Sequence, residues 1–111
     1  MKKNVDYYDA ERKHVASVMH LIDIDGTSML HREDGPALVR YYENGSLMFE
    51  GWYVKGICHR EDGPAKIWHD SDGSVNQEAW RVNGTAPTNE WIHARKRALI
   101  IDTILNEEEI I

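Results

Sequence analysis

A seven-residue motif, His-Arg-Glu-Asp-Gly-Pro-Ala, occurs twice in this sequence, at residues 31–37 and again at residues 59–65. The similarity extends beyond the motif: when residues 31–58 are aligned with residues 59–86, 13 of 28 positions are identical. A repeat at a fixed period is typical of structural units that bury their apolar faces by stacking on one another. We therefore expect two equivalent units lying side by side.

The motif predicts a turn followed by a strand. Asp34 and Gly35 favour a turn, because Asp bonds to nearby backbone and Gly tolerates a positive φ, while Pro36 fixes its own φ. Proline is tolerated at the first residue of a strand, so Ala37 and Ala65 are expected to open strands.

Each unit continues as a β-hairpin. Residues 37–43 show the two-residue period of a strand. Asn44 and Gly45 are a strong hairpin signal, and residues 46–54 form the return strand, with Gly51 as an expected bulge. The second unit repeats this pattern, with strands expected at 65–70 and 74–82 and a turn at 71–73. The predicted centre is an antiparallel β-meander built from tandem 28-residue hairpin repeats.

The same repeat pattern guides the interpretation of the N-terminal region. Residues 5–20 fit an amphipathic helix only loosely. Residues 21–26 can be aligned with residues 51–56, so we interpret residues 15–25 as a strand that closes a partial first unit.

After the second unit the pattern changes to a helical one. Thr88 is a suitable N-cap, and Glu90 lies in the first turn. Apolar residues then recur at helical spacing, at Trp91, Ala94, Ala98, Ile101 and Leu105. They predict a C-terminal helix of about four turns. Two roles are open for this stripe: it caps the open end of the sheet, or it is the seam of a homodimer.

The predicted fold class is α+β, an antiparallel β-meander capped by a C-terminal α-helix. At 111 residues the chain is expected to be one domain. Its parts are an N-terminal segment with a partial repeat (1–30), repeat 1 (31–58), repeat 2 (59–86) and the C-terminal helix (88–106).

Charge and composition argue against some classes of function. The protein is acidic, with a formal net charge of -6. Because phosphate-backbone affinity comes from Lys and Arg, we expect no direct nucleic-acid binding. No apolar run approaches the ~18 residues of a spanning helix, and no signal-peptide pattern follows Met1, so we expect no membrane association. A lone cysteine, Cys58, fits a reducing compartment, and the expected location is the cytoplasm.

The heptapeptide, followed by a Gly-centred turn and then by Trp-Tyr-Val-Lys-Gly (52–56) or Trp-Arg-Val-Asn-Gly (80–84), resembles the degenerate MORN-like repeats of phage and bacterial proteins. The resemblance covers roughly residues 20–86. It implies a run of β-hairpins without a common catalytic residue set, and it raises the expectation of a phage origin. A third motif is absent, because Pro87 begins a different sequence where another copy would start.

The sequence gives little indication of a metal site or of a catalytic nucleophile. The two His-x-x-Asp pairs begin at His31 and His59. They would lie two strands apart, roughly 10 Å, which is too far to share one ion. Cys58 and His59 are adjacent on an extended chain, so their side chains point to opposite faces and form no dyad. We therefore assign no catalytic, cofactor or metal-binding residue.

Aromatic and basic residues on the strands are the candidates for protein binding. Trp52 and Trp80 recur at the same repeat position and are interpreted as core. Aromatic and cationic residues that do not recur can form an exposed patch of the type found at interfaces. The candidate protein-binding residues are Arg40, Tyr42, Tyr53, Lys66, Trp68 and Arg81.

These features predict a non-enzymatic protein-binding module. Given the origin that the resemblance implies, the hypothesis is an anti-defence inhibitor, encoded by a phage, that occludes a host enzyme in the host cytoplasm. The partner is not identified by the sequence, and a homodimer through the C-terminal helix is a further option. Two alternatives stay open: a small metal-dependent hydrolase using the His-x-x-Asp pairs, and a structural, oligomeric component of a phage particle.

Overall fold

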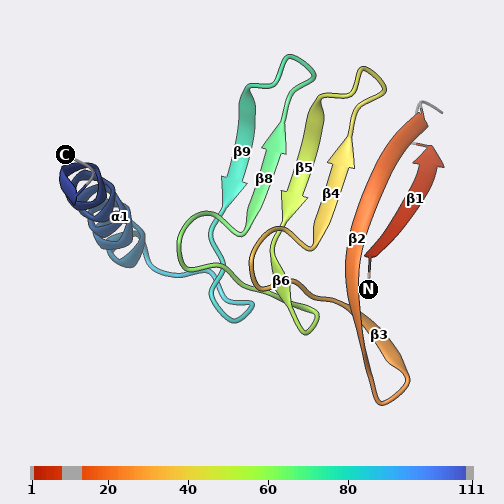
Figure 1. Cartoon of the computed structure of the whole chain (residues 1–111), viewed down its shortest axis with the longest axis horizontal. Coiled ribbons are helices and arrows are strands. Elements are labelled where there is room, and N and C mark those ends of the chain that lie inside the picture. The colour runs from red at the N-terminus through yellow and green to blue at the C-terminus, as the bar shows by residue number, and fades with distance from the viewer. Residues whose placement is uncertain (1, 9–13, 110–111) are drawn as a thin grey trace.

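The computed structural model describes residues 2–8 and 14–109. It is an antiparallel meander followed by one long helix (Figure 1). The elements are β1 (Lys2–Tyr8), β2 (His14–Ile24), β3 (Thr27–Leu30), β4 (Leu38–Tyr41), β5 (Leu47–Gly51), β6 (Tyr53–Val54), β7 (Ile57–Cys58), β8 (Lys66–His69), β9 (Val75–Ala79) and α1 (Asn89–Glu109). The main sheet has the order β1-β2-β4-β5-β8-β9, β3 pairs with the far end of β2, and β6 pairs with β7. The predicted α+β meander with a C-terminal helix is therefore confirmed.

The hairpin tips are three-residue loops. At the first tip the Tyr42 N–H donates to the Ser46 carbonyl over 2.8 Å, and the Gly45 N–H donates to the Tyr42 carbonyl over 2.9 Å. Gly45 has a φ of 86°, so the loop is a type I turn followed by a left-handed residue. The second tip repeats both bonds at Asp70, Gly73 and Ser74. The extra loop residue accompanies a register shift after Arg40 and after Trp68.

Neighbouring hairpins are also joined at these tips. The Tyr42 hydroxyl donates to the His69 carbonyl over 2.7 Å, and the Asn44 side-chain amide donates to the Ser71 carbonyl over 3.1 Å. The two hairpins are thereby held side by side at the upper end of the sheet in Figure 1.

The motif histidine fixes the turn that ends its own unit. His31 Nδ1 accepts a hydrogen bond from the Lys55 N–H over 2.9 Å, and His59 Nδ1 accepts one from the Asn83 N–H over 2.9 Å. Lys55 and Asn83 have positive φ values of 48° and 51°. Asp25, at the equivalent turn of the partial first unit, has a φ of 51°, which agrees with the alignment of residues 21–26 on 51–56.

The motif arginine closes its own loop. Arg32 Nε donates to Asp34 over 3.0 Å, and its Nη1 donates to the Pro36 carbonyl over 3.4 Å. A Cβ at Gly35 would lie 2.7 Å from Arg32 Cζ, so only glycine lets the guanidinium fold back over the loop. The second motif repeats this arrangement with Arg60, Asp62, Gly63 and Pro64.

The same arginine also connects consecutive units. Arg60 Cζ lies 3.8 Å from the ring centroid of Trp52, which belongs to the preceding repeat. Guanidinium stacking on an indole is favourable both through the ring quadrupole and through the apolar area it covers. The motif therefore carries its loop closure and its stacking contact on one side chain.

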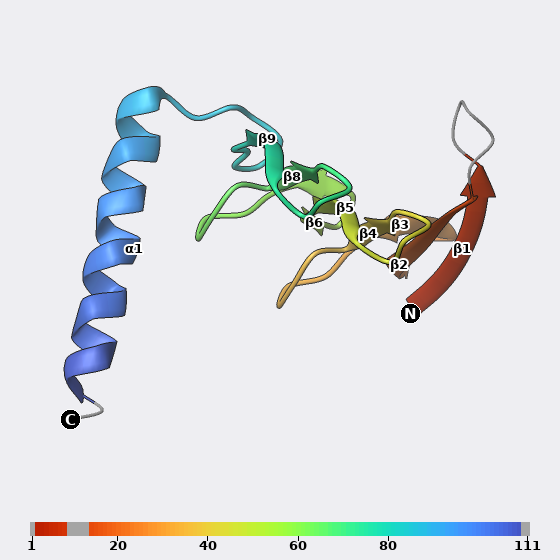
Figure 2. The same ribbon diagram turned by 90° about the horizontal axis from the view of Figure 1, so that it is seen from above.

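Within residues 2–8 and 14–109, no second layer covers the main sheet, which is seen edge-on in Figure 2. Among the residues with described side chains, the buried apolar ones are Ala37, Phe49, Ala65 and Trp80. The motif alanines are 0% exposed, because the Ala37 and Ala65 amides and carbonyls pair with strands on both sides. The radius of gyration is 16.2 Å, larger than the roughly 13 Å of a compact chain of this length.

The helix begins as predicted but is longer. Thr88 Oγ1 accepts a hydrogen bond from the Trp91 N–H over 3.2 Å, which is an N-cap. Trp91 lies edge-on to Trp80, with 6.0 Å between ring centroids, and Lys96 Nζ lies 5.9 Å from the Trp80 ring. Arg95 Nε donates to the Glu61 carbonyl over 2.7 Å. The first two turns of α1 thus occupy the place of a third motif.

The rest of the predicted apolar stripe does not cap the sheet. Ile101 and Leu105 are 56% and 50% exposed, so the expectation that they cover the sheet is wrong. The physical reason is direction: α1 runs away from the sheet on the side from which the loops before β4 and β8 project (Figure 2).

Replacing a motif histidine is expected to destabilise the fold. His59→Ala removes the acceptor of the Asn83 N–H and should lower the free energy of unfolding by about 1 kcal/mol, measured by urea denaturation. His93→Ala, at an exposed helix position, is the control and should change stability much less. Equal effects of the two substitutions would contradict the role given to His59.

Candidate functional site

A hollow of about 310 Å³ lies on one face of the sheet. We call it the sheet-face pocket. Its lining residues are Leu38, Arg40, Met48, Phe49, Tyr53, Lys66 and Trp68. They come from four strands, β4, β5, β6 and β8.

Strand register brings most of these side chains to one face. Arg40 pairs with Phe49, and Phe49 pairs with Trp68, so three side chains form a row across β4, β5 and β8. Leu38 and Lys66 both pair with Gly51 and form the next row. Because alternate residues of a strand share a face, the two rows lie on the same side of the sheet.

The aromatic rings of the pocket pack on one another. Phe49 and Trp68 have ring centroids 5.4 Å apart at an interplanar angle of 56°, and Arg40 Cζ lies 5.9 Å from the Phe49 ring. A Cβ at Gly51 would lie 2.8 Å from the rings of both Phe49 and Tyr53. Gly51 pairs in register with its neighbours, so the predicted bulge there is wrong, and its role is to let two rings close over the backbone.

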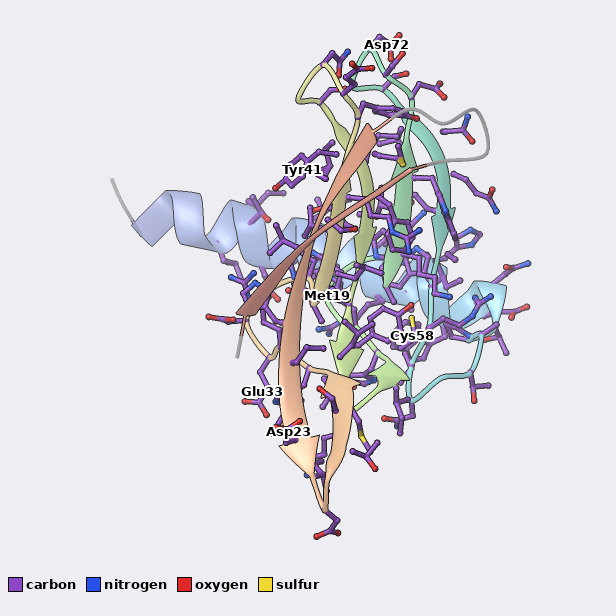
Figure 3. All side chains as sticks on the ribbon, turned by 90° about the vertical axis from the view of Figure 1, so that its right-hand side faces the viewer. Met19, Asp23, Glu33, Tyr41, Cys58 and Asp72 are labelled. Carbon is purple, nitrogen blue, oxygen red and sulfur yellow. The ribbon has the colours of Figure 1, made fainter. Side chains whose placement is uncertain are left out.

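The pocket faces away from the helix. Figure 3 shows Tyr41 on the side of the sheet toward which the C-terminal end of α1 runs. Arg40 precedes Tyr41 on β4 and therefore points to the opposite side. A partner on the sheet-face pocket would not meet the helix.

Of the six predicted protein-binding residues, the structure brings four together in this pocket: Arg40, Tyr53, Lys66 and Trp68. It does not bring Tyr42 or Arg81 there. The Tyr42 hydroxyl is bonded to the next hairpin tip, and Arg81 Nη1 donates to the Trp80 carbonyl over 2.6 Å. Phe49 and Met48 were not predicted; pairing the first strand with its return strand would have placed Phe49 beside Arg40.

A second hollow, of about 280 Å³, lies between the two motif loops and the start of α1. Its lining residues are Arg32, Glu33, Trp52, Val54, His59, Arg60, Glu61, Asp62 and Arg95. Its guanidinium groups are engaged within the protein: Arg32 and Arg60 bond their own loops. The hydrogen bond from Arg32 lowers the pKa of Asp34. This hollow is therefore the seam between stacked units.

The two hollows differ in how their residues repeat. Each repeat residue that lines the seam is identical at the equivalent position of the other unit, as in the pairs Arg32 and Arg60 or Trp52 and Trp80. Every position that lines the sheet-face pocket differs between the units, as follows: Leu38/Lys66, Arg40/Trp68, Met48/Asn76, Phe49/Gln77 and Tyr53/Arg81. The identical positions hold the units together, and the varied positions make one face of the sheet chemically unique.

The described part of the chain gives little indication of a metal site or of a reactive thiol. Among those residues, no group of three or more His, Cys, Asp or Glu side chains lies close enough to hold a metal ion. Burial raises the pKa of the Cys58 thiol above its usual value, whereas a nucleophilic cysteine needs a lowered one. Figure 3 places Cys58 at the lower part of the sheet, far from Asp72 at the hairpin tip.

Comparison with family models, with curated proteins and with solved structures found no match for this chain. Within the described residues, α1 does not have the combination of length and apolar character needed to cross a membrane.

Cys58 should react slowly with alkylating reagents. Since the thiolate is the reactive form and burial raises its pKa, the folded protein should be modified by iodoacetamide at neutral pH more slowly than glutathione. Mass spectrometry over time provides the measurement, and urea-unfolded protein is the control, expected to react faster. Faster modification of the folded protein than of glutathione would indicate an activated thiol and contradict this assignment.

Gly51→Ala should destabilise the fold and close the sheet-face pocket, because the new Cβ meets two rings at 2.8 Å. The expected loss is about 1–3 kcal/mol of unfolding free energy, measured by urea denaturation. The second unit supplies a matched background, since it has Ala79 and Gln77 where the first has Gly51 and Phe49. In a Phe49→Gln background, Gly51→Ala should cost clearly less; an unchanged cost would contradict the steric explanation.

Proposed function

We propose that this protein is a non-enzymatic binding module that docks a protein partner on the sheet-face pocket. The observation that supports this function best is the contrast between the two units: residues that hold the units together are identical, and residues of the pocket all differ. Stacking alone gives no reason for Arg40, Phe49 and Trp68 to stand in one row on an uncovered face.

The chemistry of the pocket defines the kind of partner. Tyr53 and Trp68 offer half-buried rings beside the buried ring of Phe49, and Arg40 and Lys66 bring two cationic groups to the same hollow. Tyr, Trp and Arg are the residues most enriched at interface hot spots. The complementary ligand is a protein segment that presents a large apolar side chain beside a carboxylate.

An inhibitory role extends this proposal. The resemblance of the motif to MORN-like repeat proteins favours a phage origin, and a module with a docking face on one side of its sheet can occlude an enzyme without catalysis of its own. The proposed target is a host defence enzyme in the cytoplasm of the infected cell. Support for this extension comes from the motif alone.

The docking face can be tested with variants on the two sides of the sheet. Immobilised wild-type protein and its Trp68→Ser and Tyr41→Ser variants would each select from a random dodecapeptide library. Wild-type protein and Tyr41→Ser are expected to enrich peptides with an apolar residue next to Asp or Glu. Trp68→Ser should lose most of this enrichment, and Lys66→Glu should lose preference for the acidic residue.

The same variants then capture proteins from an extract of the native host, read by mass spectrometry. A partner bound by wild-type protein and Tyr41→Ser, and lost with Trp68→Ser, supports the proposal when circular dichroism shows all three folded. Enrichment that is unaffected by Trp68→Ser, or is lost equally with Tyr41→Ser, would overturn the assignment of the face.

A further inference from the structure

Strand β9 forms one edge of the main sheet. Within the described residues it pairs only with β8, and four of its five residues, Val75 to Glu78, are exposed. The helix α1 packs on Trp80, just after the lower end of β9 in Figure 1, and leaves these residues uncovered. An uncovered strand edge presents backbone N–H and C=O groups with which another chain can pair.

The first repeat shows how such an edge is filled. Its equivalent strand, β5, pairs antiparallel with β8, and Glu50 lies opposite Ile67. The Trp52 N–H donates to the Ala65 carbonyl over 2.7 Å. Because alternate residues of an antiparallel strand direct their backbone groups to the same side, those of Glu50 point to β8 as well. In β9 the residue equivalent to Glu50 is Glu78, so its backbone groups point to the open edge.

The side chains of the two edges also correspond. Glu50 Oε2 lies 3.4 Å from Nε2 of His69, which belongs to the strand that β5 receives. Glu78 is the same residue type at the equivalent position, and it is exposed. Within the described part of the chain, no strand lies beside it to provide a counterpart of His69. A cationic side chain at that place would complete the arrangement.

The hairpin tips differ in a way that sets the charge of an added strand. In the first tip, the Asn44 side-chain amide donates to the Ser71 carbonyl of the next hairpin. The aligned residue of the second tip is Asp72. Its Oδ1 accepts from the Ser74 N–H over 2.9 Å, as Asn44 Oδ1 accepts in the first tip. Asp72 Oδ2 therefore takes the position of the amide nitrogen that faces the next strand, where a carboxylate accepts hydrogen bonds and cannot donate them.

A second position of the tip changes in the same direction. The Tyr42 hydroxyl donates to the His69 carbonyl, and the residue aligned with Tyr42 in the second tip is Asp70. A further hairpin of the same kind would bring carbonyl oxygens against these carboxylates, which is repulsive. Lys and Arg side chains would be attracted instead.

We propose that the open edge of β9 is a second interaction surface, on which an extended segment rich in Lys and Arg, from a partner protein, adds as an antiparallel strand. The segment bonds to the Glu78 backbone as β8 bonds to β5, and its cationic side chains lie beside Glu78, Asp70 and Asp72. A second copy of this chain paired through its own β9 would supply carboxylates in place of cations. The edge contains none of the residues of the sheet-face pocket, so this inference does not depend on the proposed function.

Peptide binding to the full chain tests the added strand. The probe is a synthetic peptide in which Lys alternates with Val. One matched control has Glu in place of Lys, and another carries N-methyl groups on its backbone nitrogens, which removes the donors and keeps the charge. Isothermal titration calorimetry should detect saturable binding of the Lys peptide alone, and hydrogen exchange should show protection of the Glu78 N–H when it is added. Absence of binding, or equal binding of the N-methylated peptide, would overturn the proposal.

Charge reversal locates the site on the molecule. Glu78→Lys should raise the dissociation constant of the Lys peptide by about tenfold or more, and Asp72→Asn, which gives the second tip the residue of the first, should raise it by a smaller factor. Asp23→Lys makes the same charge change as Glu78→Lys at an exposed position far from Asp72 (Figure 3) and should have little effect.

Two outcomes would contradict this assignment of the edge. Equal effects of Glu78→Lys and Asp23→Lys, with circular dichroism showing both variants folded, would indicate attraction without a site. A dimer in sedimentation equilibrium whose Glu78 N–H is protected without peptide would show that a second copy fills the edge instead.

Discussion

The arginine of the repeated motif is the interaction on which this architecture depends. It bonds the aspartate and the proline carbonyl of its own loop, and in the second unit it also lies over the tryptophan of the unit before it. A one-layer sheet has no opposing surface against which to bury its side chains. The contacts between its hairpins must therefore provide the stability that a buried core provides in other folds. At the end of the array, Trp91 and Lys96 take the arginine's place against Trp80. The start of the helix thus makes the contact that a third motif would make.

The residues that join the units are therefore distinct from the residues of the strand faces, which differ between the units. His31, Arg32 and Ala37 have equivalents in the second unit that play the same part in the joint: the histidine accepts from a turn amide, the arginine closes its own loop, and the alanine is fully buried. Side chains on the strand faces meet no such demand. They can change from one unit to the next without loss of the joint, as they do at Arg40 and Trp68, which occupy equivalent positions of the two units. In the seam, the guanidinium groups of Arg32 and Arg60 bond their own loops, whereas the sheet-face pocket is lined by aromatic, apolar and cationic side chains.

The sequence was sufficient for the meander, the hairpin tips and the start of the helix, because these follow from local rules: turn residues, two-residue alternation and an N-cap at Thr88. It was insufficient where the outcome depends on residues far apart in the chain. The bond from Lys55 to His31 spans 24 residues, and no spacing rule anticipates it. Phe49 joined the candidate site through cross-strand register, and Gly51 is required by two rings that close on it. Tyr42 was predicted to bind a partner, but in the structure its hydroxyl donates to the His69 carbonyl of the neighbouring hairpin.

The direction of α1 decides how many surfaces the molecule offers. Had the helix folded back on the sheet, its isoleucines would have covered one face and the protein would have gained a second layer. Running outward (Figure 2), it leaves the sheet-face pocket open and leaves Ile100, Ile101, Ile104 and Leu105 exposed.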